Sequence, residues 1–141
     1  MSSLYDTDIL AWSHQQVERL RRIAAGERVN DVDWPNVIEE VESVGNEQLH
    51  AVESLLVQAR LHDLKTEAWP LPHEVPHWRA EARGFRDDAA SRYAPSMRQR
   101  IDLSALYQRA LRRMPAARDD LPPLPVPQTC PVSLDEFLSD K

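Results

Sequence analysis

The chain has 141 residues, of which 42% are hydrophobic and 28% charged. This composition is typical of a globular protein and excludes a disordered chain, and the length suits one domain with a substantial core. The formal net charge of −6 disfavours nucleic acid as the main partner. We therefore expect a single domain over residues 1–141, and the scarcity of glycine together with the clustered prolines favours long α-helices with proline-rich connections.

The location of the protein is indicated by its N-terminus and by its cysteine content. Asp6 and Asp8 precede any apolar run, which is not the pattern of a signal sequence, and no run reaches the roughly 18 residues of a membrane helix. Cys130 is the one cysteine, so it can form no internal disulfide. A reducing compartment is the default for such a chain, and we expect a cytoplasmic protein without membrane contact.

The first predicted helix covers residues 7–25. Its apolar residues recur at helical spacing, so that one face is apolar and the other polar. The segment from Asp6 to Asp8 provides a capping side chain and acidic residues for the first turn, and Gly26 is suited to end the helix.

The second predicted helix, residues 34–66, is the one around which we expect the others to pack. Asp33 is its expected N-cap, and Pro35 falls in the first turn, where its missing N–H is harmless. Its apolar residues form two stripes, separated by roughly 80–100° on the helical wheel. The first stripe consists of Ile38, Val41, Gly45, Leu49, Val52, Leu56 and Ala59, and the second of Val37, Val44 and Leu55. Two stripes favour a helix wedged between neighbours.

Gly45 is an unusual residue for the interior of such a helix. Glycine destabilises this position by about 1 kcal/mol relative to alanine. We therefore expect that it permits the close approach of another backbone, or else marks a kink.

The remainder of the chain alternates helices with proline-rich connections, at residues 67–76 and 115–131. Asp102 is an expected N-cap, and Ser133 with Glu136 matches a capping box. An extended Pro-rich segment over 119–132 should pack on the bundle. The further predicted helices cover residues 77–93, 102–114 and 133–139. Because no strand pattern occurs, the fold class is all-α: a compact helical bundle around one long central helix, with a Pro-rich C-terminal segment and a short last helix.

Two motifs carry a resemblance to a known family. They are Leu4-Tyr5-Asp6-Thr7-Asp8 near the start and Ile38-Glu39-Glu40-Val41-Glu42-Ser43-Val44-Gly45 in the central helix. With Trp78-Arg79, Pro95-Ser96-Met97 and Cys130-Pro131 in the same order, the chain resembles the bacterial family called domain of unknown function 29 over nearly its whole length. The resemblance implies a compact α-helical domain with no established activity, and it carries no catalytic residue onto this sequence.

Charged residues near the apolar stripes are the candidates for a functional site. Glu42 and Asp63 point inward on the helical wheel, and Arg60 lies at nearly the same angle as Glu42. A buried carboxylate is strongly destabilising unless it is paired, so both should meet arginines of the third helix. The expected network consists of Glu42, Arg60, Asp63, Arg83, Arg86 and Arg92. Such a network either fixes the register of the bundle or belongs to a site with a perturbed pKa.

Histidines provide weak candidates for metal binding. Glu47 and His50 have the i, i+3 spacing of di-iron bundles, but both point away from the apolar stripe. His73 and His77 are four residues apart, yet the prolines beside them prevent a regular helix. His62 would add a ligand only if distant segments met. We predict no metal and no cofactor, and the sequence contains no phosphate-binding or dinucleotide-binding glycine motif.

The leading hypothesis for function is a small cytoplasmic interaction module that binds a protein partner or a second copy of itself. The contact would be formed by the basic segment 65–118, which carries 11 basic and 6 acidic residues, or by the Pro-rich segment, and we do not expect an enzyme. One alternative is a metal-dependent enzyme built on the helical bundle. Another is a nucleic-acid-binding accessory protein that uses arginines and aromatic side chains of residues 78–118.

Overall fold

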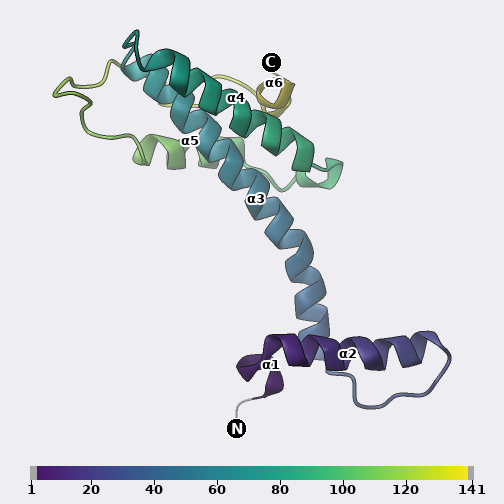
Figure 1. Cartoon of the computed structure of the whole chain (residues 1–141). Coiled ribbons are helices and arrows are strands. Elements are labelled where there is room, and N and C mark those ends of the chain that lie inside the picture. Colours follow the sequence, from purple (N-terminus) through teal and green to yellow (C-terminus); the bar gives the residue numbers. More distant parts are fainter. Residues whose placement is uncertain (1–2, 140–141) are drawn as a thin grey trace. The chain divides into compact units, whose positions relative to one another are not determined.

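A computed structural model describes residues 3–139 of the chain. Its α-helices are α1 (Leu4–Thr7), α2 (Ile9–Ala24), α3 (Trp34–Ala68), α4 (Val75–Arg92), α5 (Leu103–Arg112) and α6 (Leu134–Ser139), with a short 3₁₀ helix at Pro95–Met97 (Figure 1). The described residues form no strand, apart from one isolated bridge between Arg118 and Leu121. The all-α prediction and the long central helix are confirmed. None of the helices in this part of the chain combines the length and apolar character needed to cross a bilayer.

Two compact units make up the chain. Unit 1 is Met1–Asn46 and unit 2 is Glu47–Lys141, so the residues of α3 are shared between them. A single domain over 1–141 stays a prediction. Each unit is described here by itself.

Unit 1 begins with two helices where the sequence predicts one. The Ser3 side chain accepts a hydrogen bond from the backbone N–H of Asp6 and caps α1. The backbone of Asp8 is not helical, with φ −152° and ψ 82°. Its carboxylate accepts a hydrogen bond from the N–H of Ala11 at 3.1 Å and so caps the start of α2. An aspartate that satisfies a free donor in this way starts a new helix. Gly26, with φ +92°, follows the end of α2 as expected.

Polar contacts hold α1 and α2 to the start of α3. The indole N–H of Trp12 donates to Asp33 at 2.9 Å, and Gln16 accepts from the backbone N–H of Asp33 at 2.8 Å. Hydrogen bonds from Asn36 and Trp12 lower the pKa of the Asp33 carboxyl below its usual value. The Tyr5 hydroxyl donates to Glu40 at 2.6 Å, and this bond raises the pKa of Tyr5 to about 12.

Unit 2 contains the main hydrophobic core. The second part of α3, residues 47–68, belongs to this unit. It buries apolar residues against the amphipathic helix α5 and against Phe137 of α6. The most completely buried core residues of α3 are Val52, Leu56, Val57, Ala59 and Leu64, and those of α5 are Leu106, Tyr107 and Ala110. Asp102 caps α5 as predicted, because its carboxylate accepts from the N–H of Ala105 at 3.1 Å.

The Pro-rich segment lies on unit 2. The indole N–H of Trp69 donates to the carbonyl of Leu121 at 2.9 Å, and the N–H of Leu124 donates to the carbonyl of Ala68 at 2.9 Å. The hydroxyl of Tyr107 donates to the carbonyl of Pro127. Since proline has no N–H to donate, the segment is anchored largely through its carbonyl groups.

The expectation that α3 is wedged between neighbours along its whole length is wrong for its first part. Ile38, Val41 and Val44 of unit 1 are 54%, 69% and 65% exposed, although they belong to the predicted stripes. Apart from its chain neighbours and the backbone of its own helix, no atom of residues 3–139 lies within 4 Å of the position where a Cβ on Gly45 would be. The described residues therefore do not supply the close backbone approach that this glycine suggested.

Candidate functional site

A buried cluster of opposite charges lies where α4 runs back alongside the second part of α3 (Figure 1). We call Arg60, Asp63 and Arg86 the arginine cluster. Nη1 of Arg86 donates to both carboxylate oxygens of Asp63, at 3.0 and 3.2 Å. Nη1 of Arg60 is 3.4 Å from the same carboxylate. Within the described residues, Asp63 is the one carboxylate that pairs with these two guanidinium groups.

Aromatic rings enclose the two guanidinium groups. The side chain of Arg60 is only 8% exposed and that of Arg86 12%. The guanidinium of Arg60 lies 5.2 Å from the ring centre of Tyr107 and 5.3 Å from that of Phe137, and that of Arg86 lies 5.6 Å from Phe137. The negative ring faces stabilise the cations. Burial raises the pKa of the Tyr107 hydroxyl, and the nearby charge of Arg60 opposes this effect.

Two donors of the cluster lack acceptors. Nε of Arg60 and Nε of Arg86 are buried and have no hydrogen-bond partner among residues 3–139. A buried donor without a partner destabilises the folded state by about 1–3 kcal/mol, and more when it is charged. The cluster therefore holds more positive charge and more donors than Asp63 can satisfy.

A hollow of about 370 Å³ opens beside the arginine cluster. Its lining comes from two facing helices, namely Arg60, Asp63, Thr66 and Glu67 of α3 and Arg79, Arg83 and Arg86 of α4. Four guanidinium groups face two carboxylates there. Neither Arg79 nor Arg83 takes part in an ion pair found within the described part of the chain. The hollow is consequently positive.

The structure brings together part of the charged network that the sequence suggested. Arg60, Asp63 and Arg86 meet, and Arg83 lines the hollow beside them. Arg92 is exposed and does not line it. Arg79 was not among the candidates, although it precedes Arg83 by four residues and Arg86 by seven, a spacing that places the three on one side of α4.

The expectation that Glu42 points into a core is corrected by the structure. Glu42 is exposed and belongs to unit 1, whereas the arginines lie in unit 2. The helical wheel gives the direction of a side chain but not the presence of a neighbour at that level of the helix. At the level of Glu42 the apolar stripe itself is exposed, so a carboxylate beside it needs no partner.

The histidine candidates do not come together. Nδ1 of His62 is 2.8 Å from the carbonyl of Gln58, and its ring packs against Phe85. His73 and His77 are exposed. Among residues 3–139, no group of three or more His, Cys, Asp or Glu side chains is placed to hold a metal ion.

An exposed apolar surface in unit 1 was missed by the sequence reasoning. We call Trp34, Ile38, Val41 and Val44 the apolar face; each is at least 49% exposed. Trp34, Ile38 and Val41 follow one another at spacings of four and three residues on one side of α3, and Val44 lies about 60° around the helix axis from Val41. Further exposed apolar residues of the unit are Leu4, Ile9, Leu10 and Val17. The sequence contained one indication of this exposed surface, because residues 1–33 contain too little helix to cover two apolar stripes of α3.

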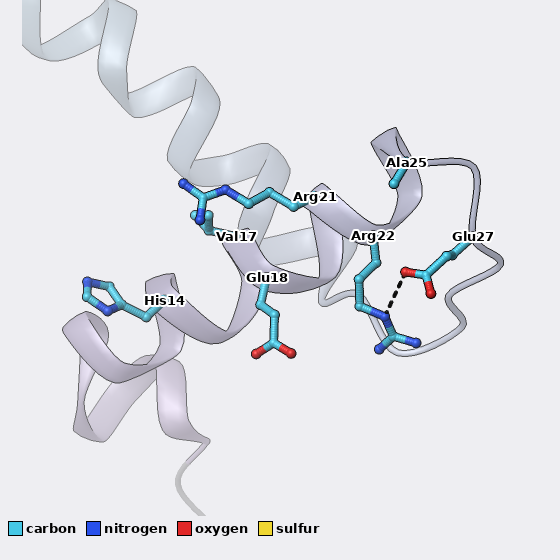
Figure 2. Close-up of a pocket in the computed structure, with 7 residues that line it drawn as sticks. All are labelled: His14, Val17, Glu18, Arg21, Arg22, Ala25 and Glu27. Atoms are coloured by element: carbon cyan, nitrogen blue, oxygen red, sulfur yellow. Dashed lines mark hydrogen bonds and ion pairs between the residues drawn. The ribbon is translucent and has the colours of Figure 1, made fainter.

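A second hollow, of about 520 Å³, lies on α2 and the loop after it. Figure 2 shows its seven lining side chains spread along α2 and the start of the loop after it, with Arg22 paired to Glu27 at 3.2 Å. The lining mixes both signs of charge, with His14, Glu18 and Arg21 beside Val17. All of these side chains come from one helix and its loop, so no facing element completes a set of reactive groups.

Comparison with known proteins places the chain in a family and a fold. A family model described as domain of unknown function DUF29 matches residues 4–141, nearly the full sequence. A crystal structure of an alpha-helical protein of unknown function from Rhodospirillum rubrum is similar, with 25% sequence identity and a TM-score of 0.71. That match covers 99% of this chain and 92% of the other. A comparison with curated proteins found no match.

Proposed function

The chain belongs to the DUF29 family, whose description names no activity, and we propose that it is an interaction module that pairs with a second copy of itself. Pairing occurs through the apolar face of unit 1. The observation that carries this proposal is the imbalance in unit 1 between buried and exposed apolar side chains.

Unit 1 has almost no core of its own. Of residues 3–46, only Trp12 and Gln16 are buried. A unit of this size is marginal even when its core is well packed. Covering one large apolar side chain contributes about 1.5–3 kcal/mol. A partner on the apolar face would therefore supply the burial that unit 1 lacks.

The apolar face is held ready for a partner by polar contacts on other sides of α3. Trp12 and Gln16 both bond to Asp33, and Tyr5 bonds to Glu40. These hydrogen bonds fix α1 and α2 against the start of α3 without using the apolar face. Because the surface is formed before binding, little conformational entropy is lost when a partner arrives.

A second copy of the chain suits this surface. Trp34, Ile38, Val41 and Gly45 follow the alternation of four and three residues by which two helices pack along a seam. Gly45 continues the same side of the helix, and the space above it is open, so another backbone can approach closely there. A symmetric pair places the same stripe on both sides of the contact, and each fills the grooves of the other.

Charges around the apolar face are also compatible with self-pairing. Glu39 and Glu42 are exposed on α3, and Arg21 and Arg22 are exposed on α2. The same unit thus presents both signs, so that acidic residues of one copy can meet basic residues of the other. The proposed surface differs from the Pro-rich segment suggested by the sequence, which is engaged in backbone contacts within unit 2.

We also assign this module to the cytoplasm. Support comes from Cys130, the single cysteine, whose thiol is partly buried and donates to the carbonyl of Val132 at 3.4 Å. A lone thiol is typical of proteins that remain in a reducing compartment.

The proposal predicts that Val41→Glu converts a dimer into a monomer. The new carboxylate would be buried without a partner in the contact, which opposes association strongly. Light scattering coupled to size-exclusion chromatography measures the mass of each species. The matched control is Leu124→Glu, since Leu124 is 52% exposed but lies in unit 2. A wild-type chain that stays monomeric at every concentration, or a Val41→Glu variant that stays dimeric, would overturn the proposal.

A further inference from the structure

We propose that the hollow beside the arginine cluster binds the phosphoryl group of a small phosphorylated molecule. This site is in unit 2 and is independent of the proposed pairing through unit 1. The inference depends on charge, on unsatisfied buried donors and on the rigid placement of the arginines.

The charge of the hollow calls for an anion. Arg60, Arg79, Arg83 and Arg86 line it, against the carboxylates of Asp63 and Glu67. Asp63 is already shared between Arg60 and Arg86, and no ion pair of Glu67 is found in the described part of the chain. Arg79 and Arg83 of α4 are thus available to an anion. They lie beside Arg60 and Arg86, whose two positive charges share the one carboxylate of Asp63. Guanidinium groups bind phosphate oxygens through paired, charge-assisted hydrogen bonds.

Buried donors without acceptors point to a missing partner at the same place. Arg60 is 6% exposed, its guanidinium lines the hollow, and its Nε has no acceptor among residues 3–139. Nε of Arg86 is likewise buried and has no acceptor among these residues. Long cationic side chains are rarely buried unless their hydrogen bonds are satisfied. A bound oxyanion would neutralise the excess charge, and a modest shift of the two guanidinium groups would bring their Nε atoms into its reach.

The arginine cluster is held in place before any anion binds. Phe137 packs against the guanidinium groups of both Arg60 and Arg86, which lie 5.3 and 5.6 Å from its ring centre. Asp63 fixes the Nη1 atoms of both. A site whose donors are already positioned loses little side-chain entropy on binding. In this arrangement Asp63 acts as a positioning residue and the arginines supply the contacts.

The size and surroundings of the hollow favour a small molecule. About 370 Å³ falls within the range of small-ligand pockets, although near its lower end. On α4 the positive region is bordered by Asp87, which is exposed and lies about 40° around the helix axis from Arg83. A long polyanion such as RNA would pass close to this carboxylate and be repelled, whereas a single phosphoryl group would not.

The experiment is a titration of the full-length protein at constant ionic strength, followed by calorimetry and by NMR of the arginine Nε–Hε groups. The probes are inorganic phosphate, glycerol phosphate, acetate and a short single-stranded RNA. We expect saturable binding of both phosphate compounds, with movement of the Nε–Hε signals of Arg60 and Arg86. Acetate should bind at least tenfold more weakly, since it offers two oxygens and a single negative charge, whereas both phosphate compounds offer at least three terminal oxygens and more charge (about 1.4 kcal/mol for each tenfold).

Two exposed arginines of α4 provide a matched pair of variants. Arg83→Gln removes a guanidinium that lines the hollow, and Arg92→Gln removes one that does not. Because neither residue is buried, both variants should fold as the wild type does. We expect phosphate affinity to fall about tenfold in Arg83→Gln and to stay unchanged in Arg92→Gln.

Several results would overturn the assignment. One is the absence of phosphate binding at constant ionic strength, and another is an equal loss in both variants, which would indicate a diffuse surface charge. Binding of inorganic phosphate with exclusion of glycerol phosphate would rule out a phosphorylated molecule. Tighter binding of the RNA, lost in Arg83→Gln, would assign the hollow to nucleic acid. Val41→Glu should bind phosphate like the wild type, so a failure here is separate from a failure of the pairing proposal.

Discussion

Asp63 is the residue on which the arginine cluster depends. It is a single carboxylate between two guanidinium groups, and both of these are largely buried. The sequence indicated its role, because its wheel angle placed it on the centre line of the apolar stripe. It could not indicate which arginine would pair with it, since that depends on the level at which α4 passes α3.

Replacing Asp63 should therefore destabilise the fold. Asp63→Asn leaves two neighbouring guanidinium groups without a counter-charge, and we expect the free energy of unfolding to fall by about 3 kcal/mol. Chemical denaturation measures the change. The control is Asp135→Asn, which removes an exposed carboxylate paired with Arg98 at 2.6 Å. This change should lower the free energy of unfolding by less than about 1 kcal/mol. Equal losses in the two variants would show that the cluster contributes no more than a surface ion pair.

The opposite outcomes for Glu42 and Asp63 show the limit of residue-level reasoning. Both carboxylates were placed inward by their wheel angles on the same helix. Asp63 has α4 beside it and meets Arg86, whereas Glu42 is exposed. Periodicity fixes a direction around the helix axis. Whether another helix packs against that side depends on tertiary structure.

At the scale of elements, α3 is where sequence and structure agree most and also differ most. Its predicted range of 34–66 is within two residues of Trp34–Ala68. Capping residues and prolines marked this helix and α5 well, because those signals act locally. The break at Asp8 was missed because Asp6, Thr7 and Asp8 can all cap a helix, and the sequence does not decide between them.

Gly45 gives a prediction at this scale. In a free helix, Gly45→Ala should stabilise by about 1 kcal/mol, because nothing lies within 4 Å of the added Cβ. If a second helix packs on this position, the methyl group instead keeps the two backbones apart. We therefore expect a larger dissociation constant for the dimer, measured by analytical ultracentrifugation.

Gly84→Ala is the control for this change. Gly84 is inside α4 in unit 2, and it too has nothing within 4 Å of an added Cβ. Its replacement should stabilise the helix without any effect on the dissociation constant. A Gly45→Ala dimer as tight as the wild type would show that no backbone approaches this glycine.

At the scale of the whole molecule, the two units differ in how they are stabilised. Unit 2 has an extended core built from α3, α5 and α6, and the sequence predicted it through the apolar stripes. Unit 1 has hydrogen bonds between its helices but buries only Trp12 and Gln16 among residues 3–46. The stripes of α3 look the same in both parts, so the one indication of this difference in the sequence is the small amount of helix in residues 1–33.

This difference leads to the central claim, that unit 1 completes its core with a second copy of the chain. A unit stabilised by association gains protection from exchange as the concentration rises, because binding favours the folded, paired state. The internal reference is the part of α3 in unit 2, whose core is already formed.

Hydrogen–deuterium exchange measured at several protein concentrations tests this claim most directly. We predict that the amides of residues 37–45 exchange more slowly at high concentration, while those of residues 52–64 change little. In Val41→Glu the concentration dependence of the first segment should disappear. Exchange of residues 37–45 that is the same at every concentration of the wild-type chain would contradict the account.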